Sequence, residues 1–91
     1  LPLSEVRFAL ACIEHDYYRF GSSIRTAMRA IMLSHGYLPV AYDVGLVHGV
    51  LGNLSIEDWW AHPNLIDVAH ARNCARTYLE RKDSVGVIQD Q

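Results

Sequence analysis

The hydrophobic positions in the first third of the chain recur at alternating steps of four and three residues. Eight residues keep this spacing without a slip: Val6, Leu10, Ile13, Tyr17, Phe20, Ile24, Ala27 and Ile31. A repeat of this kind is typical of a helix that buries one apolar stripe. Ser4 is a suitable N-cap, and Gly36 followed by Pro39 is a suitable end. The pattern predicts one helix over about residues 5–35, roughly 45 Å long.

The segment Gly21-Ser22-Ser23 competes with this interpretation. All three residues are poor helix formers, and they could form a turn between two shorter helices. A turn normally resets the phase of the hydrophobic repeat, whereas Tyr17, Phe20 and Ile24 keep it. We therefore favour a single helix, in which Gly21 allows a bend or a close approach.

Residues 40–53 fit two patterns. Small residues recur at helical spacing, which favours a tightly packed helix: Ala41, Gly45, Gly49 and Gly52. A strand would instead place larger residues on one face: Val40, Tyr42, Val44, Leu46 and Val50. A lone strand leaves its backbone groups unpaired, so the helix is favoured.

Two further helices are predicted after residue 53. Ser55 and Asp58 resemble a capping box, and Leu54 with Trp59 resembles a hydrophobic staple, so a short helix should run to Pro63. A last helix should begin near residue 64 and fade at 81–82, which leaves 83–91 as a frayed tail. The chain is therefore expected to be a single all-α domain over 1–91, in which three shorter helices pack on one long N-terminal helix.

Composition narrows the class of protein. Hydrophobic residues make up 51% of the chain, and the net charge is −2, with 8 basic and 10 acidic residues. That balance gives no electrostatic reason to expect nucleic acid or an anionic membrane as a partner, so a DNA-binding helical domain is disfavoured. Cys12 and Cys74 are far apart and form no CxxC pair, which indicates a reducing cytoplasm.

Few residues suggest catalysis or metal binding. His70 and Cys74 lie four residues apart and could share one helix face, but zinc needs three or four such ligands. No Ser-His-Asp arrangement and no glycine-rich phosphate loop is present. We therefore expect a protein that is not an enzyme and that holds no metal or cofactor.

One alternative is enzymatic. Arg29 and His35 match the Arg-x5-His dyad of HEPN-type helical ribonucleases and toxin-like domains, in which an arginine steadies a phosphate and a histidine moves protons. Ala30 follows the arginine where that family usually carries a polar side chain. Matches of this kind arise by chance among so many arginines and histidines, so this function ranks second.

Self-association through the long helix is the next expectation. Its acidic residues lie mainly in the first half and its basic residues mainly in the second. Two antiparallel copies that cross near Phe20 would bring Asp16 close to Arg25 of the other copy. The alternative is compensation of the dipole within one helix. The predicted homodimer interface consists of Tyr17, Phe20, Gly21 and Ile24.

The adjacent tryptophans would point about 100° apart on a helix. Trp59 suits the staple, which leaves Trp60 facing outward, and exposed tryptophan is enriched at interaction hot spots. The alternative is that both rings lie in a small core. The candidate contacts with a protein partner are Tyr18, Phe20, Ile24 and Trp60.

Three segments, Ile13–Tyr18, Gly36–Pro39 and Ser55–Trp60, together with the order of the predicted helices, resemble the QslA-like family of small helical quorum-sensing anti-activators. The resemblance implies a cytoplasmic dimer that sequesters a LuxR-type transcriptional regulator. Binding would block dimerisation of the regulator and its contact with DNA. The leading expectation is thus a regulatory protein-interaction module that occludes a partner's surface.

Overall fold

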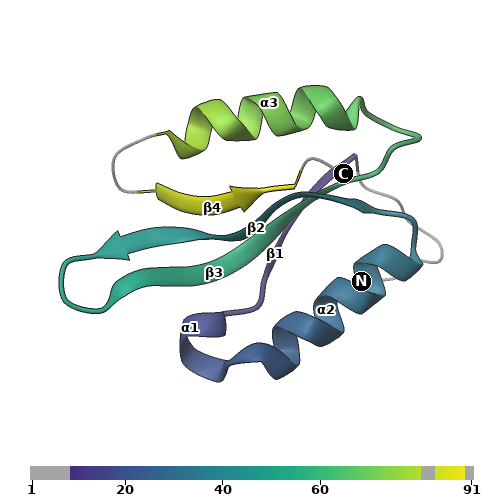
Figure 1. Ribbon diagram of the computed structural model, residues 1–91. Coiled ribbons are helices and arrows are strands. Elements are labelled where there is room, and N and C mark those ends of the chain that lie inside the picture. Colours follow the sequence, from purple (N-terminus) through teal and green to yellow (C-terminus); the bar gives the residue numbers. More distant parts are fainter. Residues whose placement is uncertain (1–8, 81–83, 90–91) are drawn as a thin grey trace.

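The computed structural model describes residues 9–80 and 84–89. Its elements follow one another as β1 (Leu10–Glu14), α1 (Tyr17–Phe20), α2 (Ser22–Ser34), β2 (Leu38–His48), β3 (Gly52–Ala61), α3 (Val68–Leu79) and β4 (Ser84–Ile88). The strands form one antiparallel sheet in the order β1-β3-β2-β4 (Figure 1). The fold is mixed α/β, and the prediction of an all-α domain is wrong.

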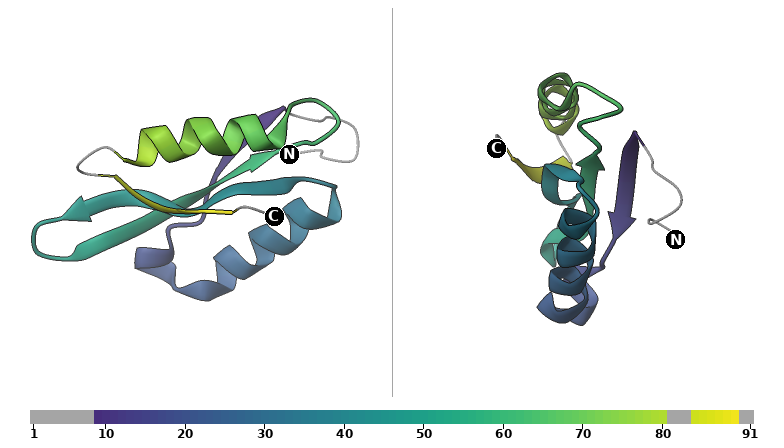
Figure 2. Two further views of the ribbon diagram at one scale, coloured as in Figure 1. Left: turned by 45° about the horizontal axis from the view of Figure 1, so that its top comes forward. Right: turned by 90° about the vertical axis from the view of Figure 1, so that its right-hand side faces the viewer.

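The chain makes two crossover connections. β1 and β2 both run antiparallel to β3, so they are parallel to each other and are joined through α1 and α2. β3 and β4 are related in the same way across β2 and are joined through α3. Crossovers are almost always right-handed, and these two start from strands of opposite direction. The two longer helices therefore lie on opposite faces of the sheet (Figure 2).

The core is correspondingly divided by the sheet. On the α2 face, Met32, Tyr37 and Trp60 form one buried cluster. On the α3 face, a second cluster contains Val40, Ala61 and Ala75. Successive residues of a strand point to opposite faces, so β3 contributes to both clusters.

Residues 5–8 of the predicted long helix lie outside the described residues, and the rest of that segment is two helices preceded by a strand. Gly21 separates α1 from α2 with a positive φ of 75°, a conformation that glycine adopts without strain. The turn that the phase of the repeat argued against is therefore present. Residues 10–14, which include Leu10 and Ile13 of the repeat, pair with β3, from Leu10 opposite Ala61 to Glu14 opposite Glu57. A short apolar run fits strand or helix equally well, and this distant pairing decides it.

The middle of the chain is a β-hairpin. β2 pairs with β3 through a tight connection at residues 49–51, so residues 40–48 are strand and the favoured helix is wrong. The single-face strand pattern is wrong in detail as well, because Val40 and Tyr42 pack on opposite faces of the sheet. The objection to a lone strand fails because its partner is β3, and the short helix predicted between Ser55 and Pro63 is therefore wrong. Gly45 sits at an irregularity of the ladder, where a Cβ would overlap the carbonyl oxygen of Leu54.

The sequence predicts the C-terminal part of the fold better than the N-terminal part. α3 falls within the expected last helix, although its N-cap is Asp67, whose carboxylate accepts the His70 backbone N–H at 3.2 Å. The predicted frayed tail is wrong over Ser84–Ile88, which forms the edge strand β4. Residue 83 and residues 90–91 lie outside the described residues.

Candidate functional site

Asp58 is the centre of a polar network on the α2 face. Asp58 is buried, with only 1% of its surface exposed. The Nε of Arg29 donates to Oδ2 at 2.7 Å, and a terminal guanidinium nitrogen donates to Oδ1 at 3.1 Å. Oδ1 also lies 3.0 Å from His15 Nε2 and accepts the backbone N–H of Asp43 at 2.8 Å. Every oxygen of this buried carboxylate is therefore hydrogen-bonded, as burial of a charge requires.

Asp43 forms the second half of the network. Its φ of 56° lies in the left-handed region, at an irregular stretch of β2. Its Oδ1 accepts from Arg25 at 3.0 Å, Arg29 at 3.0 Å and the Ser55 hydroxyl at 2.8 Å. Burial disfavours the charged carboxylate, but the Ser55 hydrogen bond and the two arginines outweigh it and lower the pKa of Asp43.

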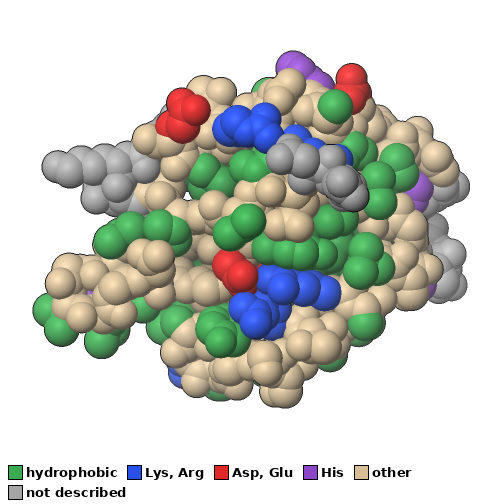
Figure 3. Space-filling view, viewed as in Figure 1, with side chains coloured by type: hydrophobic (Ala, Val, Ile, Leu, Met, Phe, Trp, Pro, Cys, Tyr) green, Lys and Arg blue, Asp and Glu red, His purple; other side chains and the backbone are tan. Residues whose placement is uncertain are grey.

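Arg29 is the cation shared by both carboxylates. Burial opposes its charge, but hydrogen bonds and charge attraction from Asp58 and Asp43 dominate, so its pKa is raised. Its guanidinium also lies 3.9 Å from the ring centroid of Tyr42. Figure 3 shows basic side chains meeting an acidic one on the α2 side of β2.

A metal site at this network is a natural hypothesis. Ligand atoms of His15, Asp43 and Asp58 lie within 4.8 Å of one another. However, the carboxylate oxygens already accept from two arginines. Both nitrogens of His15 are also engaged, because Nδ1 accepts the Tyr17 backbone N–H at 3.2 Å and Nε2 meets Asp58. A cation would have to displace a guanidinium group, so the arrangement suits a clamp that fixes α2 to the sheet.

The ribonuclease dyad has no matching arrangement. Arg29 faces the sheet, where two carboxylates compensate its charge. His35 is the exposed C-cap residue of α2. The arginine thus lacks the free positive charge with which the dyad would hold a phosphate.

Three of the four predicted partner contacts are exposed. Tyr18, Phe20 and Ile24 are 45%, 52% and 43% exposed, respectively. They lie on α1 and the start of α2, beside Gly21, whose Cβ position has open space around it. Tyr17 of the predicted dimer interface is also exposed and packs under Arg25 at 3.8 Å from the ring centroid.

Trp60 is not available to a partner. It is 1% exposed in the core beside Met32 and Tyr37. The expectation of an outward-facing Trp60 is wrong because the segment is a strand, which sends the two tryptophans to opposite faces. Trp59 is the more accessible ring. Its Nε1 donates to Glu57 at 2.6 Å, and its ring meets Tyr78 edge to face at 5.4 Å between centroids.

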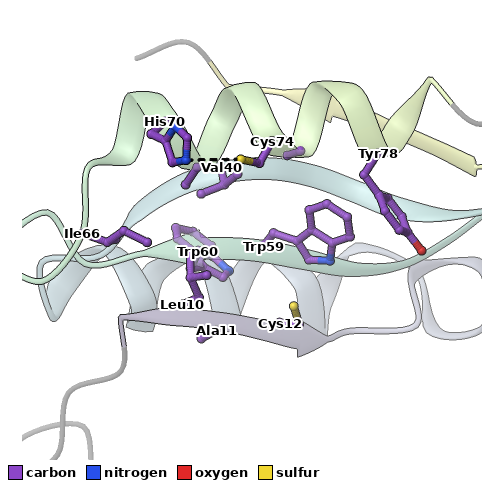
Figure 4. A pocket seen from close by; sticks show the side chains of 12 residues that line it. Leu10, Ala11, Cys12, Val40, Trp59, Trp60, Ile66, His70, Cys74 and Tyr78 are labelled. Atoms are coloured by element: carbon purple, nitrogen blue, oxygen red, sulfur yellow. Dashed lines mark hydrogen bonds between the residues drawn. The ribbon is translucent and has the colours of Figure 1, made fainter.

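A groove of about 480 Å³ lies on the α3 face, between α3 and the edge strand β1. α3 packs over β2 and β4 and leaves the β1–β3 half of this face open (Figure 4). Apolar residues from four elements and the segment before α3 line it: Leu10, Ala11, Val40, Trp59, Trp60, Ile66, Ala71, Ala75 and Tyr78. Trp60 and Ala11 border it from the strands, since their side chains belong to the α2-face cluster. We define this hollow as the α3–β1 groove.

Besides the Trp59 indole N–H and the Tyr78 hydroxyl, the polar groups of the residues that line the α3–β1 groove are two thiols and an imidazole. On α3, Cys74 Sγ lies 3.6 Å from His70 Nε2, along the helix face that borders the groove (Figure 4). On β1, burial raises the pKa of the Cys12 thiol, aided by the charge of Glu57 and a hydrogen bond to it. The His70–Cys74 pair identified in the sequence is therefore real, but no third His, Cys, Asp or Glu joins it within metal-binding distance among the described residues.

Sequence reasoning missed this groove because its walls come from segments up to 68 positions apart, from Leu10 to Tyr78. The available signal was the Trp59-Trp60 pair, which a strand assignment would have placed on opposite faces.

None of the described helices has the length and apolarity needed to cross a membrane. No protein-family model, curated protein or solved structure matches the chain.

Proposed function

We propose that this protein is a non-catalytic regulatory module that binds an apolar segment of a partner protein in the α3–β1 groove and thereby occludes that segment. The supporting observation is the groove itself. Its volume of about 480 Å³ falls in the range of natural binding sites, and nearly all of its lining is aliphatic or aromatic.

The openness of the groove favours a protein segment over a small molecule. Small-molecule sites enclose most of the ligand's surface. Here Leu10 on one rim is 56% exposed and Tyr78 on the opposite rim is 44% exposed. A chain can enter such a groove from the side and place alternate side chains against Trp59.

Magnitudes set the expected affinity. Burial of one aliphatic or aromatic anchor contributes about 1.5–3 kcal/mol. A micromolar Kd corresponds to about 8 kcal/mol, so about three to five anchors would be required even without the costs of association. The rim from His70 to Tyr78 covers about two helical turns, or roughly 12 Å, which suits two or three anchors. We therefore expect weak, reversible binding.

The partner's identity rests on the sequence resemblance alone. On that resemblance, the proposed partner is a LuxR-type regulator, and binding would block its dimerisation and its contact with DNA. The same resemblance proposes a cytoplasmic location. The exposed residues Tyr18, Phe20 and Ile24 stay predicted as additional contacts, although they belong to the α1–α2 side of the molecule rather than to the α3–β1 groove.

Selection of a displayed peptide library on the protein tests the proposal. The Cys74→Trp variant fills the groove, and Thr77→Trp places the same bulk at an exposed position of α3 outside the groove lining. We expect apolar peptides whose binding is lost in Cys74→Trp and kept in Thr77→Trp. Peptides that bind both variants equally would contradict the groove as the site.

A further inference from the structure

The outer edge of β1 is unpaired within the described sheet, because β1 pairs with β3 alone. Two hydrogen bonds establish which backbone groups face outward. His62 N–H donates to the Ala9 carbonyl at 3.0 Å, and His15 N–H donates to the Ile56 carbonyl at 2.8 Å. Along an antiparallel ladder, hydrogen-bonded pairs alternate with pairs that are not hydrogen-bonded to each other. The odd-numbered residues of β1 therefore bond to β3. The N–H and C=O groups of Leu10, Cys12 and Glu14 therefore point away from the sheet.

The described residues of this edge include no lysine, proline or bulge. Natural edge strands are blunted by lysine, proline or bulges that prevent pairing with another chain. β1 has the sequence Leu-Ala-Cys-Ile-Glu and pairs with β3 without a register shift. Leu10 exposes more than half of its surface at this edge. A strand whose residues are apolar except for Glu14 at its end, and which lies beside an apolar groove, is suited to pairing with a further strand.

We propose that two copies of this chain pair through β1, antiparallel and centred on Cys12, to form a continuous eight-stranded sheet. In this register Cys12 faces Cys12 of the second copy, and each Leu10 faces the second copy's Glu14. All three outward residues of each copy then lie in hydrogen-bonded pairs, and each pair exchanges two hydrogen bonds. Any other symmetric register leaves at least one of the three unpaired.

Charge and the groove both favour a second copy as the occupant. The chosen register keeps the two Glu14 carboxylates at opposite ends of the ladder, so no like charges meet. A net charge of −2 per copy adds little long-range repulsion. The two-fold axis is perpendicular to the sheet, so both α3 helices lie on the same face. The second copy's Leu10 and Cys12 would then extend the groove at its open β1 side and merge the two grooves into one.

This inference stands apart from the proposed partner, because it depends only on the edge of β1. Cys12 is a built-in reporter, since paired Cα atoms at the axis would lie about 5.5 Å apart. A short bis-maleimide should crosslink a variant that retains only Cys12 (Cys74→Ser) into a dimer. The matched variant that retains only Cys74 (Cys12→Ser) should stay uncrosslinked, because Cys74 lies on α3, away from the axis. Equal crosslinking of both variants would overturn the proposal.

Sedimentation equilibrium on the full chain supplies the second test. Proline at position 10 removes an outward N–H that makes no bond to β3, whereas valine keeps it. Leu10→Pro should weaken dimerisation about tenfold or more, and Leu10→Val should not. Slow exchange of the Ala11 and Ile13 amide hydrogens in Leu10→Pro will show that β1 still pairs with β3.

Amide exchange also separates the other occupants of the edge. The Leu10, Cys12 and Glu14 amide hydrogens should become protected as protein concentration rises. Protection that is independent of concentration would mean that the chain's own residues cover the edge. A wild-type protein that stays monomeric at about millimolar concentration would also overturn the proposal.

Discussion

Arg29 holds Asp58 with two nitrogens at once, Nε at 2.7 Å from Oδ2 and a terminal nitrogen at 3.1 Å from Oδ1. Such two-point pairing is the strongest arrangement open to a guanidinium and a carboxylate. It joins the middle of α2 to the inner strand β3. Since α2 has few buried residues of its own, with Met32 the only fully buried residue among those described, this ion pair is a main fastening of the helix.

Removal of one partner of this pair should destabilise the protein strongly. Arg29→Met leaves Asp58 buried without its counter-charge, which typically costs about 3–5 kcal/mol. Arg25→Met is the matched control, because within the network Arg25 pairs only with the partly exposed Asp43, and this substitution should cost about 1 kcal/mol or less. Urea unfolding measures both. A loss in Arg29→Met no larger than that in Arg25→Met would show that the clamp contributes little.

Stability should fall on acidification partly through Asp43. Its pKa is lowered in the folded protein from an ordinary value of 3.8, so the unfolded chain takes up the proton first as pH falls. The contribution is therefore complete above the ordinary value and is lost as pH drops through the lowered one. Below about pH 4, the free energy of unfolding of Asp43→Asn should depend less on pH than that of the wild type. The measurement is the free energy of unfolding between pH 2 and pH 6; parallel curves for the two proteins would contradict the assignment.

Gly45 and Gly49 test the hairpin. Alanine at position 45 would place its Cβ against the Leu54 carbonyl, while alanine at position 49 meets nothing within 4 Å. Overpacking of this kind costs about 1–3 kcal/mol, and Gly45→Ala should lie at the upper end. Gly49→Ala should change the melting temperature little. If the two substitutions had equal effects, the close approach of β2 and β3 would be in doubt.

The two tryptophans should differ as fluorophores. In Trp59→Phe the remaining Trp60 is buried, so acrylamide should quench it poorly. In Trp60→Phe the remaining Trp59 lines the α3–β1 groove and should be quenched more readily. Similar quenching of the two variants would argue against a strand at this position, which sends the rings to opposite faces.

The sequence predicted local features better than distant pairings. α3 is recognisable from its own apolar face. β1 is not, because its structure depends on pairing with residues about 50 positions away, as Leu10 with Ala61. The regular four-three spacing that crossed Gly21 therefore coincided with a strand and two helices, in which tertiary pairing overrode the periodic signal.

The polar network shows the same limit. The sequence predicts a helix cap for Asp58 and offers for Arg29 only a second-ranked match to a dyad, since each residue is interpreted within its own segment. Only the fold brings them together with Asp43 and His15. The α3–β1 groove is likewise assembled by topology, because the two crossovers place α3 over one half of a face and leave the other half open.

The central claim is that the α3–β1 groove binds an apolar protein segment. Amide and indole chemical-shift mapping with a display-selected apolar peptide tests it most directly. The account predicts shifts at Leu10, Cys12, Cys74 and the Trp59 indole N–H. Shifts confined to Tyr18, Phe20 and Ile24, with the groove unchanged, would contradict it.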